Sequence, residues 1–204
     1  MKKTYRNFFY DFDGMLADTY PHIAKSFVLT LKETRGEEID EQKAFDLFNV
    51  SYATAYDYYR VTEEEKYLFG KRNENLDTPP QPTLFPHAEE VLREAKRRGC
   101  RNFIYTNRGE FLFAYLKFFG IEDCFEDCII SAAKPNPVSL ELMLEKHGID
   151  RGESVVVGDR AIDVEGGRRA GVDGILFNPI GRVKEHCATY EITRIEELLA
   201  FLPQ

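Results

Sequence analysis

Hydrophobic and polar positions follow two different patterns along this chain. From about residue 86 onward, short apolar runs that suit buried strands alternate with amphipathic segments of helical period. The apolar runs cover residues 103–106, 128–131, 154–157 and 174–177, and the helical segments cover residues 86–98, 111–119, 138–146, 161–170 and 195–202. This alternation predicts right-handed βαβ units, and therefore an α/β fold with a parallel sheet flanked by helices.

A further strand is predicted near the N-terminus, where the aromatic run of residues 8–10 leads directly into two carboxylates. Asp11 and Asp13 are separated by one residue, and Gly14 then permits an abrupt change of direction. Two acids this close are costly to ionise together unless a cation lies beside them or one keeps its proton. The stretch fits a metal site, a shared-proton pair or a nucleophile beside an acid, although taken alone it is better explained as an ordinary Asp-Gly turn.

The segment between this strand and the alternating region has only helical signals. Apolar residues recur every four positions between residues 23 and 31, and Thr62 with an acid three residues later is typical of a capped helix start. We expect that helix to reach residue 76. Three prolines between residues 79 and 82 then form a stiff connector. The predicted domains are a core of residues 1–18 and 82–204 and an all-helical insertion of residues 19–81.

Composition and charge narrow the classes of protein. The 204 residues carry a formal net charge of −8, which argues against nucleic-acid and anionic-membrane binding, and no apolar stretch is long enough to span a bilayer. Cys124 and Cys128, the most closely spaced of four cysteines, lack the tight spacing of a zinc or redox pair. We expect free thiols in a cytoplasmic protein that is a monomer or a homodimer.

Polar side chains follow each of the first four predicted core strands. In open α/β sheets ligands bind beyond the carboxyl ends of the strands, so these side chains are expected to share one crevice. In chain order they are Asp11 and Asp13, Thr106 and Asn107, Lys134, and Asp159 with Asp163. Each one alone has a plain structural explanation as a turn, a loop or a helix cap. Their occurrence in this order is hard to attribute to turn chemistry alone.

The residue types in this set suit phosphoryl transfer. Asp11 and Asp159 supply the hard oxygen ligands that Mg²⁺ prefers, and Lys134 would neutralise the charge of a phosphoryl group. Thr106 would hydrogen-bond the phosphoryl oxygens. Asp13 could protonate the leaving oxygen and then deprotonate the attacking water.

The last acid of the set has a supporting role. If a helix begins at the fourth motif, Asp163 lies one helical turn beyond Asp159. It would then orient Lys134 or a metal-bound water without contacting the substrate.

Four motifs in this order resemble those of the haloacid dehalogenase superfamily. They are Asp11-Phe12-Asp13-Gly14-Met15-Leu16, Thr106-Asn107, Lys134-Pro135 and Gly158-Asp159-Arg160-Ala161-Ile162-Asp163. The helical insertion after the first motif is similar to the cap of the phosphoglycolate-phosphatase-like subfamily. The resemblance covers about residues 8–178, which is most of the chain.

The resemblance implies a Rossmann-like core and a Mg²⁺-dependent phosphatase with an aspartyl-phosphate intermediate on Asp11 and Asp13 as acid/base. It also implies metal ligation by the carboxylates of Asp11 and Asp159 and the backbone carbonyl of Asp13. Thr106, Asn107 and Lys134 are the expected substrate-binding residues. The expected substrate is a small phosphorylated metabolite, either phosphoglycolate-like or a sugar phosphate.

Two alternatives stay open at this point. A phosphosugar mutase of the β-phosphoglucomutase-like type would carry a cap histidine where this chain has Ile23. His22 is one position off, which is about 100° of rotation on a helix. A non-catalytic binding protein on the same scaffold would not need the complete motif set. Arg108, which follows the second motif, could reach a substrate carboxylate or phosphate, or could be a solvated loop arginine.

Overall fold

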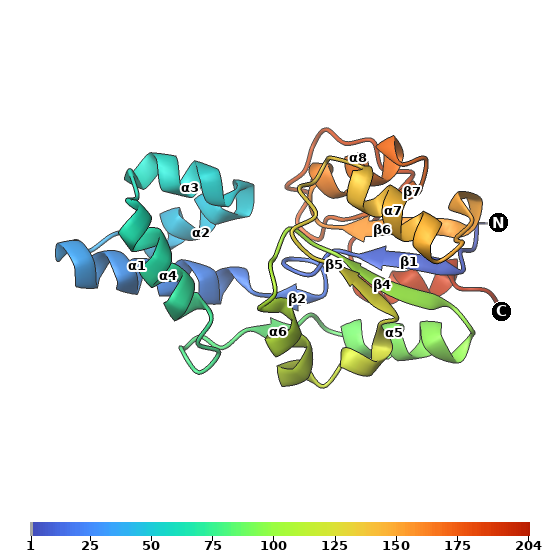
Figure 1. The fold of residues 1–204 in the computed structure, drawn as a ribbon, viewed down its shortest axis with the longest axis horizontal. Coiled ribbons are helices and arrows are strands. Elements are labelled where there is room, and N and C mark those ends of the chain that lie inside the picture. Colours follow the sequence, from blue (N-terminus) through green and yellow to red (C-terminus); the bar gives the residue numbers. More distant parts are fainter. Residues whose placement is uncertain (1) are drawn as a thin grey trace. The chain divides into compact units, whose positions relative to one another are not determined.

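The computed structural model describes residues 2–204, and these residues divide into two compact units. The first unit runs to Ala17 and resumes at Leu84, and the second is Asp18–Thr83. The chain passes from one to the other through two short strands, β2 (Ala17–Asp18) and β3 (Thr83–Leu84), which pair with each other. Both units are drawn in Figure 1.

The first unit contains a six-stranded sheet with the order β5-β4-β1-β6-β7-β8, and each pair of neighbours is parallel. The strands are β1 (Asn7–Tyr10), β4 (Arg101–Tyr105), β5 (Asp127–Ile129), β6 (Ser154–Gly158), β7 (Asp173–Phe177) and β8 (Tyr190–Ile192). The predicted parallel α/β sheet is confirmed.

Helices cover both faces of this sheet. Helices α5 (Ala88–Arg97) and α6 (Leu112–Phe119) lie on one face, and α7 (Val138–Lys146) and α8 (Ala161–Arg169) lie on the other (Figure 1). Three short 3₁₀ helices complete the unit, η1 (Glu122–Cys124), η2 (Arg151–Glu153) and η3 (Ile195–Phe201). This helix–sheet–helix layering is the one that alternating strands and helices predict.

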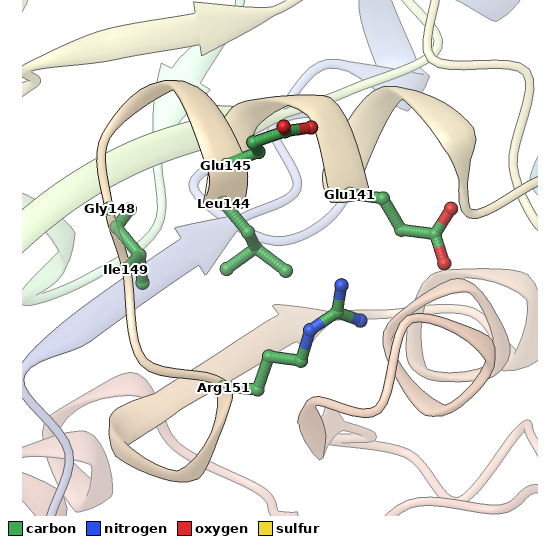
Figure 2. Close-up of a pocket in the computed structure, with 6 residues that line it drawn as sticks. All are labelled: Glu141, Leu144, Glu145, Gly148, Ile149 and Arg151. Carbon is green, nitrogen blue, oxygen red and sulfur yellow. The ribbon is translucent and has the colours of Figure 1, made fainter.

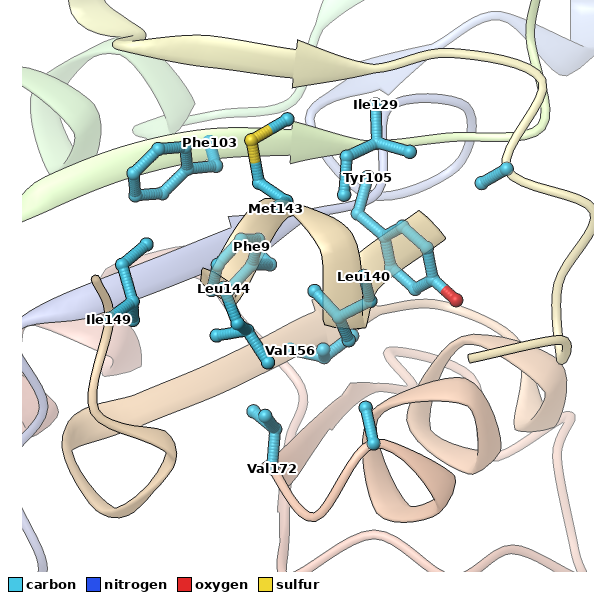
Figure 3. Close-up of a cluster of buried hydrophobic side chains, with 12 residues drawn as sticks. Phe9, Phe103, Tyr105, Ile129, Leu140, Met143, Leu144, Ile149, Val156 and Val172 are labelled. Atoms are coloured by element: carbon cyan, nitrogen blue, oxygen red, sulfur yellow. The ribbon is translucent and has the colours of Figure 1, made fainter. Parts of the chain in front are cut away.

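Alternate strand residues form the core on the α7 side of the sheet. Phe9 of β1, Phe103 of β4 and Val156 of β6 are fully buried, and the rings of Phe9 and Phe103 stack with centroids 4.9 Å apart. Leu140 and Leu144 of α7 belong to the same cluster (Figure 3). Burying side chains of this size contributes about 1.5–3 kcal/mol each, which makes the sheet a rigid base for the loops at its edge.

The strand register places the loops that follow β1, β4 and β6 side by side at the carboxyl-terminal end of the sheet. Tyr10, the last residue of β1, is opposite Ile104 of β4 on one side and Val157 of β6 on the other. The chain adds β4 and β5 on one side of β1 and then crosses to β6 on the other side, so the strand order reverses at β1. Such a switch point is where open α/β sheets bind ligands.

The second unit consists of four helices, α1 (Tyr20–Arg35), α2 (Glu41–Val50), α3 (Tyr52–Tyr59) and α4 (Glu63–Asn73). Thr62 and Glu65 form the predicted capping box at the start of α4. The unit has its own aromatic core, in which the rings of Phe27, Phe48 and Phe69 lie 5.0–5.4 Å apart. Because this core is contributed entirely by residues of the insertion, the unit has the packing of a separate domain.

A buried ion pair fastens α1 to α4 within this unit. The Arg35 Nε and Nη2 atoms donate to the two carboxylate oxygens of Glu65 over 2.5 and 2.7 Å, and the Glu65 side chain is 7% exposed. These hydrogen bonds to Arg35, together with those from Thr62, hold the pKa of Glu65 at about 2. A group with a lowered native pKa stabilises the fold above its unfolded pKa and loses that contribution as pH falls.

We expect Glu65→Gln to lower the free energy of unfolding by about 2–3 kcal/mol at pH 7, because the charge-assisted pairing is lost. The difference between wild type and variant should shrink as pH falls from about 4.5, the usual pKa of the group, towards 2. Urea unfolding at a series of pH values measures it. A difference that stays constant over this range would show that the ion pair does not stabilise the unit.

Two predicted elements differ from the structure, and one strand of the large sheet was not predicted. Helix α4 ends at Asn73 instead of residue 76, because the Asn75 side chain accepts a hydrogen bond from the Asp77 amide and begins a turn. The last helix is a 3₁₀ helix and not an α-helix. Strand β8 was not predicted, since three residues are too few to show a strand period. None of the described helices has the length and apolar character needed to cross a membrane.

Candidate active site

The site begins at the end of β1, where Asp11 is buried with 1% of its surface exposed. Its backbone amide continues the sheet by donating to Val157 of β6 over 2.8 Å. Three residues later, Gly14 adopts a φ of 82°, which turns the chain away from the sheet. The strand therefore fixes the Asp11 carboxylate at the switch point of the sheet.

Lys134 connects the ends of three different segments. Its Nζ atom lies 2.7 Å from Asp11 Oδ1 and 2.7 Å from Asp163 Oδ1, and no part of the Lys134 side chain is exposed. The Lys134 backbone amide donates to Asn107 Oδ1 over 2.9 Å, so the loop after β4 positions the loop that carries the lysine. Removing Lys134 would leave two buried carboxylates without this partner.

Asp159 completes a cluster of three buried acids. Single carboxylate oxygens of Asp11, Asp159 and Asp163 all lie within 4.8 Å of one another. Two oxygens of this cluster, Asp11 Oδ2 and Asp159 Oδ1, are buried and have no hydrogen-bond partner. On the other side of Asp159, Arg182 Nη2 lies 3.3 Å from Oδ2.

Burial makes the acids of this cluster costly to ionise, and their mutual repulsion adds to that cost. Burial and the charge of Asp163 raise the pKa of Asp11, although Lys134 opposes the shift. Burial and the charges of Asp163 and Asp11 raise the pKa of Asp159 well above its usual value. Burial disfavours the charged form of Lys134, but the Asp11 and Asp163 carboxylates outweigh it and raise the pKa of Lys134.

This donor set fits a divalent cation that prefers oxygen. Hard carboxylate oxygens are the ligands that Mg²⁺ takes, and buried polar atoms ordinarily have a partner. The unpartnered oxygens of Asp11 and Asp159 are the atoms that such an ion would satisfy. Asp163 is less available as a metal ligand, because both of its carboxylate oxygens already accept hydrogen bonds. Its Oδ1 accepts from Lys134 Nζ, and its Oδ2 accepts from the Arg160 backbone amide over 2.9 Å.

Asp13 is held by an arginine that belongs to the next loop. Arg108 Nη2 lies 2.6 Å from Asp13 Oδ1 and Arg108 Nε lies 3.0 Å from Asp13 Oδ2, which is a bidentate ion pair. The guanidinium carbon of Arg108 also lies 4.4 Å from the centre of the Tyr115 ring. Arg108 is therefore an ordered part of this site and not a solvated loop residue.

Thr106 and Asn107 lie beside these groups with different exposures. Thr106 is buried, and its Oγ1 accepts a hydrogen bond from the Arg108 amide over 3.2 Å. Asn107 is exposed, and its side-chain oxygen is the atom that receives the Lys134 amide. The structure thus brings the seven residues selected from the sequence together at the carboxyl-terminal end of the sheet; they are Asp11, Asp13, Thr106, Asn107, Lys134, Asp159 and Asp163.

Two further arginines near the carboxylates were not selected from the sequence. Arg160 Nη2 lies 3.8 Å from Asp163 Oδ1 and 4.0 Å from Asp11 Oδ2. Its position beside Asp159 in the fourth motif is a signal that could have revealed it. Arg182 follows β7 in a loop with no motif, so nothing in the sequence points to its ion pair with Asp159.

A surface pocket elsewhere in the first unit contains none of these residues. It lies between the end of α7 and the following loop and is lined by Glu141, Leu144, Glu145, Gly148, Ile149 and Arg151 (Figure 2). Two carboxylates and one guanidinium make this pocket unsuited to a phosphoryl group.

Gly158 is required for the geometry of the acid cluster. A Cβ atom at this position would lie 2.3 Å from Asp163 Cβ and 2.6 Å from its Oδ2. We expect Gly158→Ala to displace Asp163, to destabilise the protein by about 1–3 kcal/mol and to lower kcat at least about tenfold. Chemical denaturation and steady-state kinetics measure the two effects.

Gly109→Ala is the matched control, because the nearest atom to its added Cβ is Ser131 Oγ at 3.8 Å. Equal effects of the two substitutions would contradict a specific role for the close approach at Gly158.

The comparisons with known proteins agree with this geometry. The family model described as haloacid dehalogenase-like hydrolase matches residues 8–177. This span includes both strand-end acids of the first motif and the whole of the fourth motif. The chain therefore belongs to the haloacid dehalogenase-like hydrolase family.

Individual relatives cover most of the chain. A pyrophosphatase PpaX of Oceanobacillus iheyensis is 29% identical over 82% of this chain and 80% of its own length. A phosphoglycolate phosphatase of Aliivibrio fischeri is 24% identical over 79% of both chains. The hydrolase YfnB of Bacillus subtilis, solved with magnesium bound, has a TM-score of 0.78 at 20% identity, with 98% of this chain and 99% of that chain covered.

The resemblance inferred from the four motifs is thus confirmed at the level of family and fold. The chain is an enzyme, a hydrolase of the haloacid dehalogenase superfamily. The alternative of a non-catalytic protein on this scaffold is not supported.

Proposed function

We propose that this protein is a Mg²⁺-dependent phosphatase that hydrolyses a small phosphomonoester, phosphoglycolate-like or a sugar phosphate, through an aspartyl-phosphate on Asp11. The observation that carries the proposal is the asymmetry of this carboxylate. One oxygen is fixed by Lys134 at 2.7 Å, and the other is buried without a hydrogen-bond partner next to Asp159. A carboxylate held in this way can present its second oxygen to a metal ion or to the phosphorus atom of a substrate.

In the first half of the reaction, a carboxylate oxygen of Asp11 forms a bond to phosphorus while the bond from phosphorus to the ester oxygen breaks. Asp13 donates a proton to the departing oxygen, which leaves as an alcohol. Lys134 offsets the negative charge of the phosphoryl oxygens. The Thr106 hydroxyl and the side-chain NH₂ group of Asn107, which is exposed, donate hydrogen bonds to these oxygens. Fixed charges and donors of this kind stabilise phosphoryl transfer chiefly by positioning and electrostatics.

In the second half, Asp13 accepts a proton from a water molecule that attacks the phosphorus of the aspartyl-phosphate. The bond from phosphorus to Asp11 breaks, inorganic phosphate leaves and the Asp11 carboxylate is restored. Asp163 takes no proton in either half. Its hydrogen bond of 2.7 Å keeps Lys134 directed at Asp11.

The carboxylates of Asp11 and Asp159 and the backbone carbonyl of Asp13 are the groups that we propose to hold Mg²⁺. When bound, the ion would neutralise part of the negative charge that the acid cluster and a phosphoryl group bring together. The free thiols of all four cysteines agree with a reducing cytoplasm as the working compartment.

We assign the helical unit Asp18–Thr83 the role of a cap that selects the substrate and excludes water during the reaction. His22 does not have the arrangement expected of a mutase acid/base. It is fully buried, its Nδ1 lies 3.0 Å from the Thr78 carbonyl and its Nε2 lies 3.0 Å from the Asn73 carbonyl. Both ring nitrogens are thus engaged within the helical unit, which favours hydrolysis over the mutase alternative.

Phosphate release from a panel of small phosphomonoesters, with Mg²⁺ and with EDTA, tests the proposal. We expect release from at least one substrate with Mg²⁺, and loss of that release with EDTA and in Asp159→Asn. Mg²⁺ should also raise the melting temperature of wild type and not of Asp159→Asn, since only the former retains the full ligand charge. Conversion of a sugar phosphate into an isomer without free phosphate would favour the mutase, and release that EDTA leaves unchanged would exclude the metal.

A further inference from the structure

The bidentate pair between Arg108 and Asp13 occupies the residue that the proposed reaction needs at the leaving oxygen. Both Asp13 oxygens accept from the Arg108 guanidinium, at 2.6 and 3.0 Å. The side chains of Arg108 and Asp13 are only 8% and 16% exposed, so water screens the pair poorly. A leaving oxygen cannot contact either Asp13 oxygen in its best geometry until the guanidinium withdraws from it.

Withdrawal of the guanidinium is costly unless another anion replaces the carboxylate. A guanidinium is charged at every working pH, and its planar fork matches a carboxylate or a phosphate better than it matches water or an alcohol. Arg108 already reaches the place that the leaving oxygen must approach, because it contacts Asp13 itself. An anionic group one or two atoms from the leaving oxygen would therefore lie within its range.

The loop around Arg108 suits a side chain that exchanges partners while its backbone stays fixed. The Arg108 amide donates to Thr106 Oγ1, and the Arg108 carbonyl accepts from the Ser131 amide over 2.8 Å. The buried ring of Tyr115, 4.4 Å from the guanidinium carbon, gives the cation a second favourable contact as it moves. Only the end of the side chain needs to be displaced.

We propose that Arg108 determines specificity by binding an anionic group on the leaving part of the substrate, which releases Asp13 for proton transfer. The group is a carboxylate, as in phosphoglycolate, or a second phosphoryl group, as in pyrophosphate. Substrates whose leaving group is an uncharged alcohol leave the pair intact and react slowly. This inference rests on the proposed phosphatase function and specifies its substrate class.

Kinetics with three substrates test the inference. Phosphoglycolate and pyrophosphate carry the second anion in its two forms, and 2-hydroxyethyl phosphate lacks it. We expect wild type to have a kcat/KM at least about tenfold higher for one of the anionic substrates than for 2-hydroxyethyl phosphate. Which of the two anionic substrates it prefers distinguishes a carboxylate from a phosphoryl group.

Arg108→Gln should reduce this preference to about threefold or less, with most of the loss on the anionic substrate. Arg108→Lys should retain an intermediate preference, since it keeps the charge and loses the fork. Arg93→Gln, an exposed arginine on α5 paired with Glu89, is the matched control and should leave the preference unchanged.

Binding measured by calorimetry gives a second readout that does not depend on turnover. In the Asp11→Asn background, Arg108→Gln should weaken binding of the preferred anionic substrate and leave binding of 2-hydroxyethyl phosphate within about threefold. Phosphate release from all three substrates without preference, or a preference that survives in Arg108→Gln, would overturn the inference and leave the phosphatase intact. No phosphate release from any of these three substrates or from any other phosphomonoester would overturn both.

Discussion

Asp11→Asn is expected to lower kcat by at least about 10⁴-fold, because the amide cannot form the bond to phosphorus and also removes a ligand charge from the acid cluster. The fold should persist. The substituted side chain can still accept from Lys134, and the burial that raises the pKa of Asp11 shows that its charge is costly to keep there. Steady-state phosphate release and thermal unfolding of the same preparation measure the two properties.

Asp127→Asn provides the matched control for this variant. Asp127 is the first residue of β5, so it lies at the amino-terminal end of the strand, whereas the acids of the site follow the carboxyl-terminal ends of strands. Its Oδ2 atom accepts a hydrogen bond from Lys146 and contacts His147, each within 2.8 Å. The same chemical change there should cost about 1 kcal/mol of stability and leave kcat unchanged. Residual activity above about 1% in Asp11→Asn would contradict its role as the nucleophile.

Lys134→Ala is expected to have the largest effect on stability and an effect on rate second only to that of Asp11→Asn. The lysine side chain is completely buried and holds two carboxylates at 2.7 Å, so its removal deprives both of their nearest cation. We expect a loss of about 3–5 kcal/mol in the free energy of unfolding and a loss of at least about 100-fold in kcat. Denaturant unfolding and steady-state kinetics give the values.

The electrostatic origin of the stability loss can be separated from the loss of packing. In the Asp11→Asn background one of the two unpaired carboxylates is already gone, so Lys134→Ala should cost at least about 1 kcal/mol less there than in wild type. An equal cost in the two backgrounds would show that the lysine stabilises the fold by packing alone.

Much of the fold could be predicted because the relevant signals are local. The alternation of apolar strands and amphipathic helices fixes a parallel sheet, and parallel strands bring their carboxyl ends to a common edge. Asp11, Lys134 and Asp159 all follow such strands and were therefore expected to meet, and in the structure they do. In the helical unit, the capping box of Thr62 was readable from two side chains three residues apart.

The features that could not be predicted depend on contacts between distant segments. The pair of Asp13 with Arg108 joins residues 95 positions apart, and the pair of Asp159 with Arg182 links a motif to a loop without one. The sequence around His22 gave no indication that its ring would contact the carbonyl of the last residue of α4 and a carbonyl beyond it. Strand β8 could not be predicted, because its place in the sheet is set by pairing with β7 and not by its own sequence.

A covalent phosphoryl group on Asp11 is the central claim, and Asp13→Asn provides the means to detect it. Without this base the aspartyl-phosphate should hydrolyse slowly and accumulate. Wild type and Asp13→Asn are mixed with Mg²⁺ and the best substrate, quenched in acid within the first turnover and digested for mass spectrometry. We expect a phosphorylated peptide with the modification on Asp11, more abundant in the variant than in wild type. Phosphate released during that turnover with no modified Asp11 in either protein would contradict it.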